Sequence, residues 1–190
     1  MNRIPVDKNA VSSMSVEEIF SAITERQVKA LMFHSQLSTL FDFIGLSGFE
    51  KMHRHQYICE SKTMMKVSRH FIKNHGKLIP ENRVEAFQEI PLDWYRVTKD
   101  NVTPNIISQY VNKELTTWIQ WESETIEHLS EYAKRLCDLS EMIDYQFVSE
   151  MIDDVKHEVN HAKCIFYKIK ATNFSVDYIM DIQNDESIFL

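Results

Sequence analysis

Apolar residues recur every three or four positions along two long segments in the first half of the chain, residues 19–44 and 49–71. This spacing places apolar side chains on one face of an α-helix. Ser15 followed by Glu18 has the spacing of a capping box, which predicts that the first helix begins there. Because only the segment GLSG (45–48) separates the two stripes, we expect an antiparallel pair of helices joined by a tight turn.

The second half of the chain repeats this pattern. Thr103 before Pro104 is a favourable pair for a helix start, and an apolar stripe follows as far as residue 136. The pattern breaks over residues 137–141, and a fourth stripe begins near Met142 and continues to residue 169. The later segment SVDYIMDIQN predicts a short fifth helix.

The segment between the two helix pairs, residues 77–102, holds Pro80 and Pro91 and has no sustained period. It is expected to be a long connection with room for one short helix. Such a connection can run the length of a bundle, so the sequence predicts an all-α, antiparallel four-helix bundle with one long crossover. We expect residues 1–14 to form an N-terminal arm, 15–172 the bundle, and 173–190 the short C-terminal helix and tail.

Composition and charge exclude several classes of protein. With 3 Gly and 4 Pro in 190 residues, the chain has too few turn residues for an all-β fold. The net charge of -7 argues against a nucleic-acid partner. No apolar run approaches the roughly 20 residues that span a bilayer, and the N-terminus lacks a signal-like apolar core. Three scattered cysteines suit a reducing compartment, so we expect a soluble, cytoplasmic protein.

Polar residues interrupt each of the four apolar faces near its middle. In chain order they are Gln27, then Glu60 with Thr63, then Glu122, then Glu158 with His161. An ionisable group inside a bundle costs several kcal/mol unless it is paired or bound to a metal. A carboxylate and an imidazole three residues apart share one helix face, which makes the Glu158 and His161 pair half of a site for a divalent transition metal.

Two other histidines are expected to have ordinary roles. Glu50 and His53 form a second Glu-x-x-His pair, which we expect to face mostly solvent. His34 lies on the first apolar stripe beyond Gln27 and is expected to be a hydrogen-bonded core residue.

The chain resembles the ferritin and bacterioferritin family over most of its length. GLSGF (45–49) looks like the GLxGF turn between the first two helices of prokaryotic ferritins, and FIKNHG (71–76) resembles the end of their second helix. Residues 144–166 resemble the fourth helix. The resemblance implies a ferritin-like bundle that assembles into a hollow shell of twenty-four copies and handles iron.

Members of that family hold two irons in a buried ferroxidase site, with a Glu from the first helix and a Glu-x-x-His on the second. Carried over position by position, the first-helix Glu falls on Gln27. The second-helix motif falls on Glu60 and Thr63, so its carboxylate is kept and its histidine is lost. The two replaced ligands are those that mainly hold the first iron.

The remaining ligands come from the third and fourth helices. The third-helix Glu falls on Glu122, or on Thr125 in an alignment without a gap, and the fourth-helix pair falls on Glu158 and His161. The resemblance therefore implies a site that has lost its first metal position and keeps its second. The predicted metal ligands are Glu60, Glu122, Glu158 and His161, and the ion is iron at a single site, with Mn or Zn as alternatives.

The leading functional expectation is a ferritin-like iron-storage or iron-binding subunit with an incomplete di-iron site and weak or absent ferroxidase activity. Its expected partners are Fe(II) ions, other copies of the chain in a homo-oligomeric shell, and an active ferritin subunit with which it can co-assemble. A structural or interaction protein without functional metal is the alternative, with the polar layer setting helix register. A third interpretation is a di-metal oxidase or oxygenase in which His34, His53 or Cys59 supplies a missing ligand.

Overall fold

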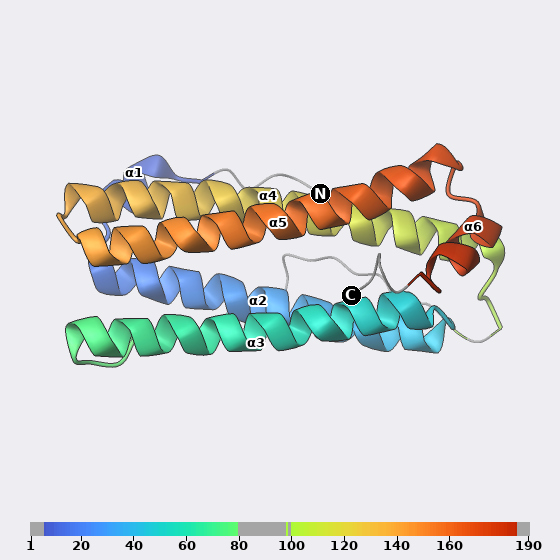
Figure 1. Cartoon of the computed structure of the whole chain (residues 1–190), viewed down its shortest axis with the longest axis horizontal. Coiled ribbons are helices and arrows are strands. Elements are labelled where there is room, and N and C mark those ends of the chain that lie inside the picture. The colour runs from blue at the N-terminus through green and yellow to red at the C-terminus, as the bar shows by residue number, and fades with distance from the viewer. Residues whose placement is uncertain (1–5, 80–97, 99, 186–190) are drawn as a thin grey trace.

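The computed structural model describes residues 6–79, 98 and 100–185, and all regular secondary structure among them is helical. The long helices are α2 (Val16–Phe43), α3 (Ser47–His75), α4 (Pro104–Asp138) and α5 (Met142–Ala171). They lie side by side along the long axis of the molecule (Figure 1). The predicted all-α four-helix bundle is confirmed.

Two short helices lie at opposite ends of this bundle (Figure 1). α6 (Val176–Ile182) is the predicted short fifth helix. α1 (Lys8–Ser12) falls within the expected N-terminal arm and packs beside α4, where its Val11 is buried. None of the described helices is both long enough and apolar enough to cross a membrane.

The four long helices form two antiparallel pairs, α2 with α3 and α4 with α5. α3 ends at the opposite end of the bundle from the start of α4 (Figure 1), which is the arrangement that one long crossover requires. Most of the expected connection, at residues 80–97 and 99, lies outside the described residues. The short helix considered for this segment therefore lies outside them too.

Local sequence signals set the helix ends where they were predicted. Ser15 Oγ accepts from the Glu18 N–H, and the Glu18 carboxylate accepts from the Ser15 N–H, which completes the capping box of α2. The Thr103 hydroxyl accepts from the Ile106 N–H at the start of α4. Gly76 ends α3 in the left-handed conformation, with φ of 64°, which a glycine adopts without strain.

The core consists of two apolar clusters with a polar layer between them. One cluster occupies the α2–α3 turn end of the bundle and includes Phe33, Leu37, Phe41, Phe49, Leu115 and Ile165. The other occupies the opposite end and includes Phe20, Ile23, Phe71, Leu129, Phe147 and Met151. Each fully buried side chain of this kind stabilises the fold by about 1.5–3 kcal/mol. The buried polar residues of the middle layer belong to neither cluster, so the two clusters must offset their cost.

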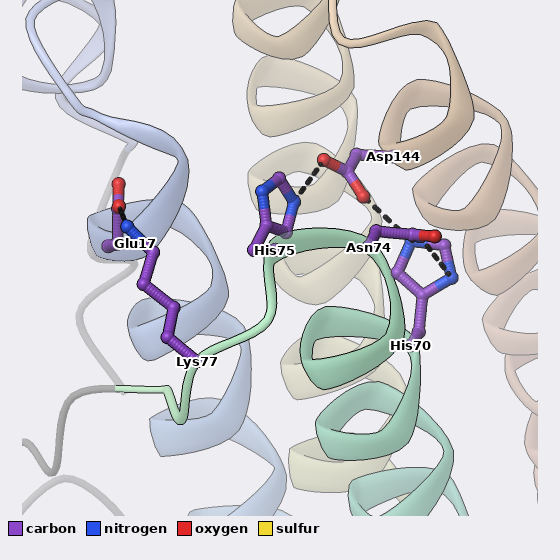
Figure 2. A network of polar contacts seen from close by, with 6 residues as sticks. All are labelled: Glu17, His70, Asn74, His75, Lys77 and Asp144. Carbon is purple, nitrogen blue, oxygen red and sulfur yellow. Dashed lines mark hydrogen bonds and ion pairs between the residues drawn. The ribbon is translucent and has the colours of Figure 1, made fainter.

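A buried carboxylate joins the end of α3 to the start of α5. Asp144 is 1% exposed and accepts hydrogen bonds from His70 Nε2 at 2.7 Å and from His75 Nε2 at 2.8 Å. Figure 2 shows the two rings on either side of this carboxylate, with Lys77 paired to Glu17 of α2 nearby. These contacts fix the helix ends of the two hairpins relative to each other.

The GLSG turn does more than reverse the chain, because Gly48 lies directly against the residues that follow α6. A Cβ at Gly48 would overlap the carbonyl oxygen of Gln183 and lie 2.8 Å from its Cβ. The Gly48 N–H also donates to Gln183 Oε1 at 3.3 Å. The turn therefore provides the site where α6 packs on the bundle.

Replacing Gly48 with alanine is expected to displace α6. Overpacking costs about 1–3 kcal/mol, and the higher helix propensity of alanine offsets about 0.5–1 kcal/mol of that. We expect a lower melting temperature and faster amide hydrogen exchange in α6. Ser47→Ala, one residue earlier and exposed, is the matched control. A Gly48→Ala protein with unchanged exchange in α6 would show that this close approach is not required.

Candidate metal centre

A cavity of about 50 Å³ lies within the polar layer. One ordered water needs only about 10–15 Å³, so the space can hold an ion with its waters. All four long helices contribute to its walls. The polar residues that line it are Arg26 and Gln27 from α2, Glu60 and Thr63 from α3, Glu122 and Thr125 from α4, and Asp154 and Glu158 from α5.

The structure brings three of the four sequence-predicted ligands to this cavity, namely Glu60, Glu122 and Glu158. The fourth, His161, is not among the lining residues. It lies one helical turn beyond Glu158 on α5, half-buried, with its ring centroid 6.4 Å from that of Trp118. Cys59 does not line the cavity either, and its sulfur lies 3.5 Å from His55 Nε2.

Burial and mutual repulsion shift the pKa of each carboxyl group in the cavity. Burial, followed by the charge of Glu158, raises the pKa of Glu60 to about 8. Burial, followed by the charge of Asp154, raises the pKa of Glu158 to about 7. For Glu122, burial and then the Glu158 and Glu60 carboxylates raise the pKa well above its ordinary value, although Arg26 acts in the opposite direction. The positive charge of Arg26 therefore does not compensate three ionised carboxylates in this site.

Several buried acceptor atoms around the cavity have no hydrogen-bond partner among the described residues. They are Gln27 Oε1, Glu122 Oε1 and Glu158 Oε2. A buried polar atom without a partner costs roughly 1–3 kcal/mol, more when charged. Because all three atoms are oxygens that accept or coordinate, a bound cation would satisfy them together. The residues present therefore fit a divalent cation.

Arg26 supplies a positive charge at the edge of the cavity. Its Nη2 donates to Thr125 Oγ1 at 2.7 Å and to the Trp121 carbonyl at 3.4 Å. Its guanidinium carbon lies 4.3 Å from the centroid of the Trp121 ring. These contacts hold Arg26 against α4, and they occupy Thr125, the residue that the ungapped alignment put in place of Glu122.

His34 of α2 is not among the residues that line the cavity, but it lies near two of the carboxylates that do. One ligand atom from each of His34, Glu60 and Glu122 lies within 4.8 Å of the other two. A divalent ion with bonds of about 2.0–2.2 Å keeps its ligand atoms up to about 4 Å apart, so small side-chain movements would bring these three onto one ion. The expectation that His34 is a hydrogen-bonded core residue is confirmed, since its Nδ1 lies 2.8 Å from His53 Nδ1.

His53 is fully buried, so the expectation that it faces solvent is wrong. Its Nε2 lies 3.0 Å from Glu114 Oε1, and Glu114 is also fully buried. The sequence does contain a signal for this burial, because His53 follows the core residue Phe49 by four positions and therefore shares its helix face. Its partner Glu114 comes from another helix, which no local pattern reveals.

Burial is the main cause of the charge state of the two histidines. It lowers the pKa of His53 to about 3, and together with the charge of His53 it lowers the pKa of His34 well below its ordinary value. Both rings are thus neutral near pH 7, and the neutral imidazole is the form that binds metals.

Two solved structures share this architecture. A ferritin from the hyperthermophilic archaeon Archaeoglobus fulgidus, described as a novel open pore ferritin, superimposes with a TM-score of 0.73 and 17% identity over 95% of this chain and 98% of that chain. An engineered closed form of the Archaeoglobus fulgidus ferritin gives a TM-score of 0.71 and 16% identity over 94% and 98%. The sequence matches no protein-family model and no curated protein. At this identity the similarity establishes a ferritin-like fold.

The raised carboxyl pKa values predict that the metal-free protein loses stability as the pH rises. Unfolded glutamates, with an ordinary pKa of 4.5, ionise as the pH rises through about 4.5, whereas folded Glu158 and Glu60 release protons only near pH 7 and 8. The folded state then binds more protons than the unfolded state. The free energy of unfolding should therefore fall between about pH 4.5 and 8, by up to about 1.4 kcal/mol per pH unit for each group, and level off above that range.

Melting curves recorded in chelator over this pH range test the prediction. Glu60→Gln should flatten the pH dependence, and Glu150→Gln, an exposed glutamate of α5, should leave it unchanged. If the melting temperature of the Glu60→Gln protein depended on pH as steeply as that of the unmodified protein, the Glu60 carboxyl group would not be the buried group that releases a proton in this range.

Proposed function

We propose that this chain binds Fe(II) in the cavity of its polar layer and serves as an iron-storage subunit with a ferritin-like fold. One observation carries the proposal: unpartnered oxygen atoms from three helices converge on a cavity that three carboxylates share. Removing such a set from water is unfavourable unless a cation compensates it. Carboxylate ligands suit Fe(II), and they also accept Mn(II) or Zn(II).

We propose that the site holds one ion per chain and oxidises it slowly or not at all. Gln27 offers a neutral amide oxygen and Thr63 a hydroxyl where the ferritin resemblance implies a glutamate and a histidine. Both line the cavity, so the first metal position keeps its space but has weak ligands. Rapid oxidation by oxygen requires two adjacent irons that share the electrons they give up. His161, the fourth ligand that the sequence predicts, is not among the residues that line the cavity, so we do not retain it in the proposed ligand set.

Assembly of many copies is part of the proposal. The ferritin-like fold and the resemblance to shell-forming ferritins support a closed homo-oligomer, which can include an active ferritin subunit. Large apolar side chains are exposed on the described surface, among them Ile58, Met65, Met142, Ile143 and Tyr167. A particle mass near that of twenty-four chains of 22.5 kDa, measured by light scattering, is the expected result.

Anaerobic titration with Fe(II), followed by calorimetry, is expected to give one tightly bound ion per chain. Glu122→Gln should weaken binding at least about tenfold, which corresponds to about 1.4 kcal/mol, because it removes one negative charge from the ion's surroundings. The exposed Glu150→Gln should bind like the unmodified protein. If the unmodified protein binds no ion, the layer only sets helix register, and the chain is a structural protein on this scaffold.

Restoring the two replaced ligands should create a second metal position. We expect the double variant Gln27→Glu with Thr63→His to bind two Fe(II) per chain and to oxidise them at least about tenfold faster than the unmodified protein in stopped-flow mixing with oxygen. Each single substitution, which restores one ligand, is the matched control. Fast oxidation of two Fe(II) per chain by the unmodified protein would contradict the proposed single site.

A further inference from the structure

We propose that His34 supplies the nitrogen ligand of the ion in this cavity, and that the buried residues His53 and Glu114 hold its ring in the binding orientation. The inference rests on the proposed cation binding, and it names a ligand and two positioning residues. It places the ion toward the α2–α3 turn end of the polar layer, between His34, Glu60 and Glu122.

The first argument is the geometry of His34 itself. Its side chain has no exposed area, and its Nδ1 is taken by His53. The other ring nitrogen, Nε2, has no hydrogen-bond partner among the residues that the structure describes. The ring also lies within the three-residue group formed with Glu60 and Glu122. A buried imidazole with one nitrogen fixed and the other open beside two carboxylates is the form that a metal-binding histidine takes.

The position of His34 along α2 shows why it can replace a lost ligand. It lies seven residues after Gln27, which is about two helical turns along the same face. Thr63 lies one turn beyond Glu60 in the opposite direction along the bundle axis, because α3 is antiparallel to α2. Thr63 has no ring nitrogen where the resemblance implies a histidine. His34 offers one from the opposite side of Glu60 along the bundle axis.

The second argument concerns hydrogen positions. Only one hydrogen fits between the two Nδ1 atoms, which are 2.8 Å apart, so one ring donates and the other accepts. When His34 donates, its Nε2 keeps a lone pair for a metal. His53 then carries its own hydrogen on Nε2, which lies 3.0 Å from Glu114 Oε1. The two atoms make no hydrogen bond in the structure, and burial raises the pKa of Glu114 well above its ordinary value. A small rotation of the Glu114 carboxyl group would let its carbonyl oxygen accept from His53 Nε2, which would fix the tautomer and orientation of the ligand.

The reverse tautomer defines the competing explanation. If His53 donates instead, His34 carries its hydrogen on Nε2 and donates to the nearby carboxylates. The chain of polar groups would then only satisfy hydrogen bonds within the core. Binding of an ion at His34 distinguishes the two arrangements.

Aromatic packing holds the two rings in place. The Phe41 ring stacks on His53 at a centroid distance of 5.4 Å. Trp118 contacts both histidines, with centroid distances of 5.4 Å to His34 and 5.6 Å to His53. These contacts keep water from the rings and leave their orientation to the hydrogen bonds at their nitrogens.

Crystals of the full chain soaked in Co(II) test the ligand directly, without any variant. An anomalous map is expected to place the ion about 2.1 Å from His34 Nε2, with Glu60 and Glu122 as further ligands. An ion held by Glu60, Glu122 and Glu158, with His34 only hydrogen-bonded, would overturn the inference and leave the proposed function standing. A protein that binds no Co(II) would overturn both.

Titration of Co(II), followed by its visible absorption, separates the two candidate nitrogens. We expect His34→Gln to weaken binding at least about 100-fold and His161→Gln to change it less than about threefold. Melting curves show whether each variant is folded. The opposite order, with His161 essential and His34 dispensable, would overturn the inference.

The positioning role is tested with Glu114→Gln, which keeps the shape of the side chain but can stabilise either tautomer of His53. We expect about 10- to 100-fold weaker Co(II) binding, the range seen when a residue behind a metal ligand is changed, with the ion at the same position in the anomalous map. A merely structural role would alter the melting temperature and leave the affinity of the folded protein unchanged, and that result would overturn the positioning role.

Discussion

Confining three carboxylates to the interior of one helical bundle is the constraint on which the rest of this structure depends. Glu60, Glu122 and Glu158 come from three helices and share one cavity. Their mutual repulsion and their burial oppose folding, and the apolar clusters at both ends of the bundle must outweigh that cost. A bound cation would offset this cost, which is the basis of the proposed metal site.

The fold could be predicted from the sequence because its signals are local. The three-to-four-residue period, the Ser15 capping box, the Thr103 and Pro104 start and the Gly76 end each involve residues within one or two helical turns. The same spacing predicted which polar residues of the middle layer face inward. A helix that packs one face against its neighbours buries every side chain on that face, polar or apolar.

The rest of the site could not be predicted, because it depends on contacts between helices. His53 was placed on the surface since it pairs with Glu50 in the sequence, yet its partners are His34 on α2 and Glu114 on α4. Asp144 was not singled out, although two histidines of α3 donate to it. A buried polar residue is tolerated when another helix supplies its partner, and a single sequence carries no record of that pairing.

Asp154 of α5 is exposed and also lines the cavity, so its carboxylate is shared by the interior site and the outer surface of the bundle. A hydrated divalent ion approaching there can exchange bound waters for carboxylate oxygens in stages, which lowers its dehydration barrier. Under the proposed function, an ion held by the interior carboxylates would therefore have a further carboxylate on the outer side of α5.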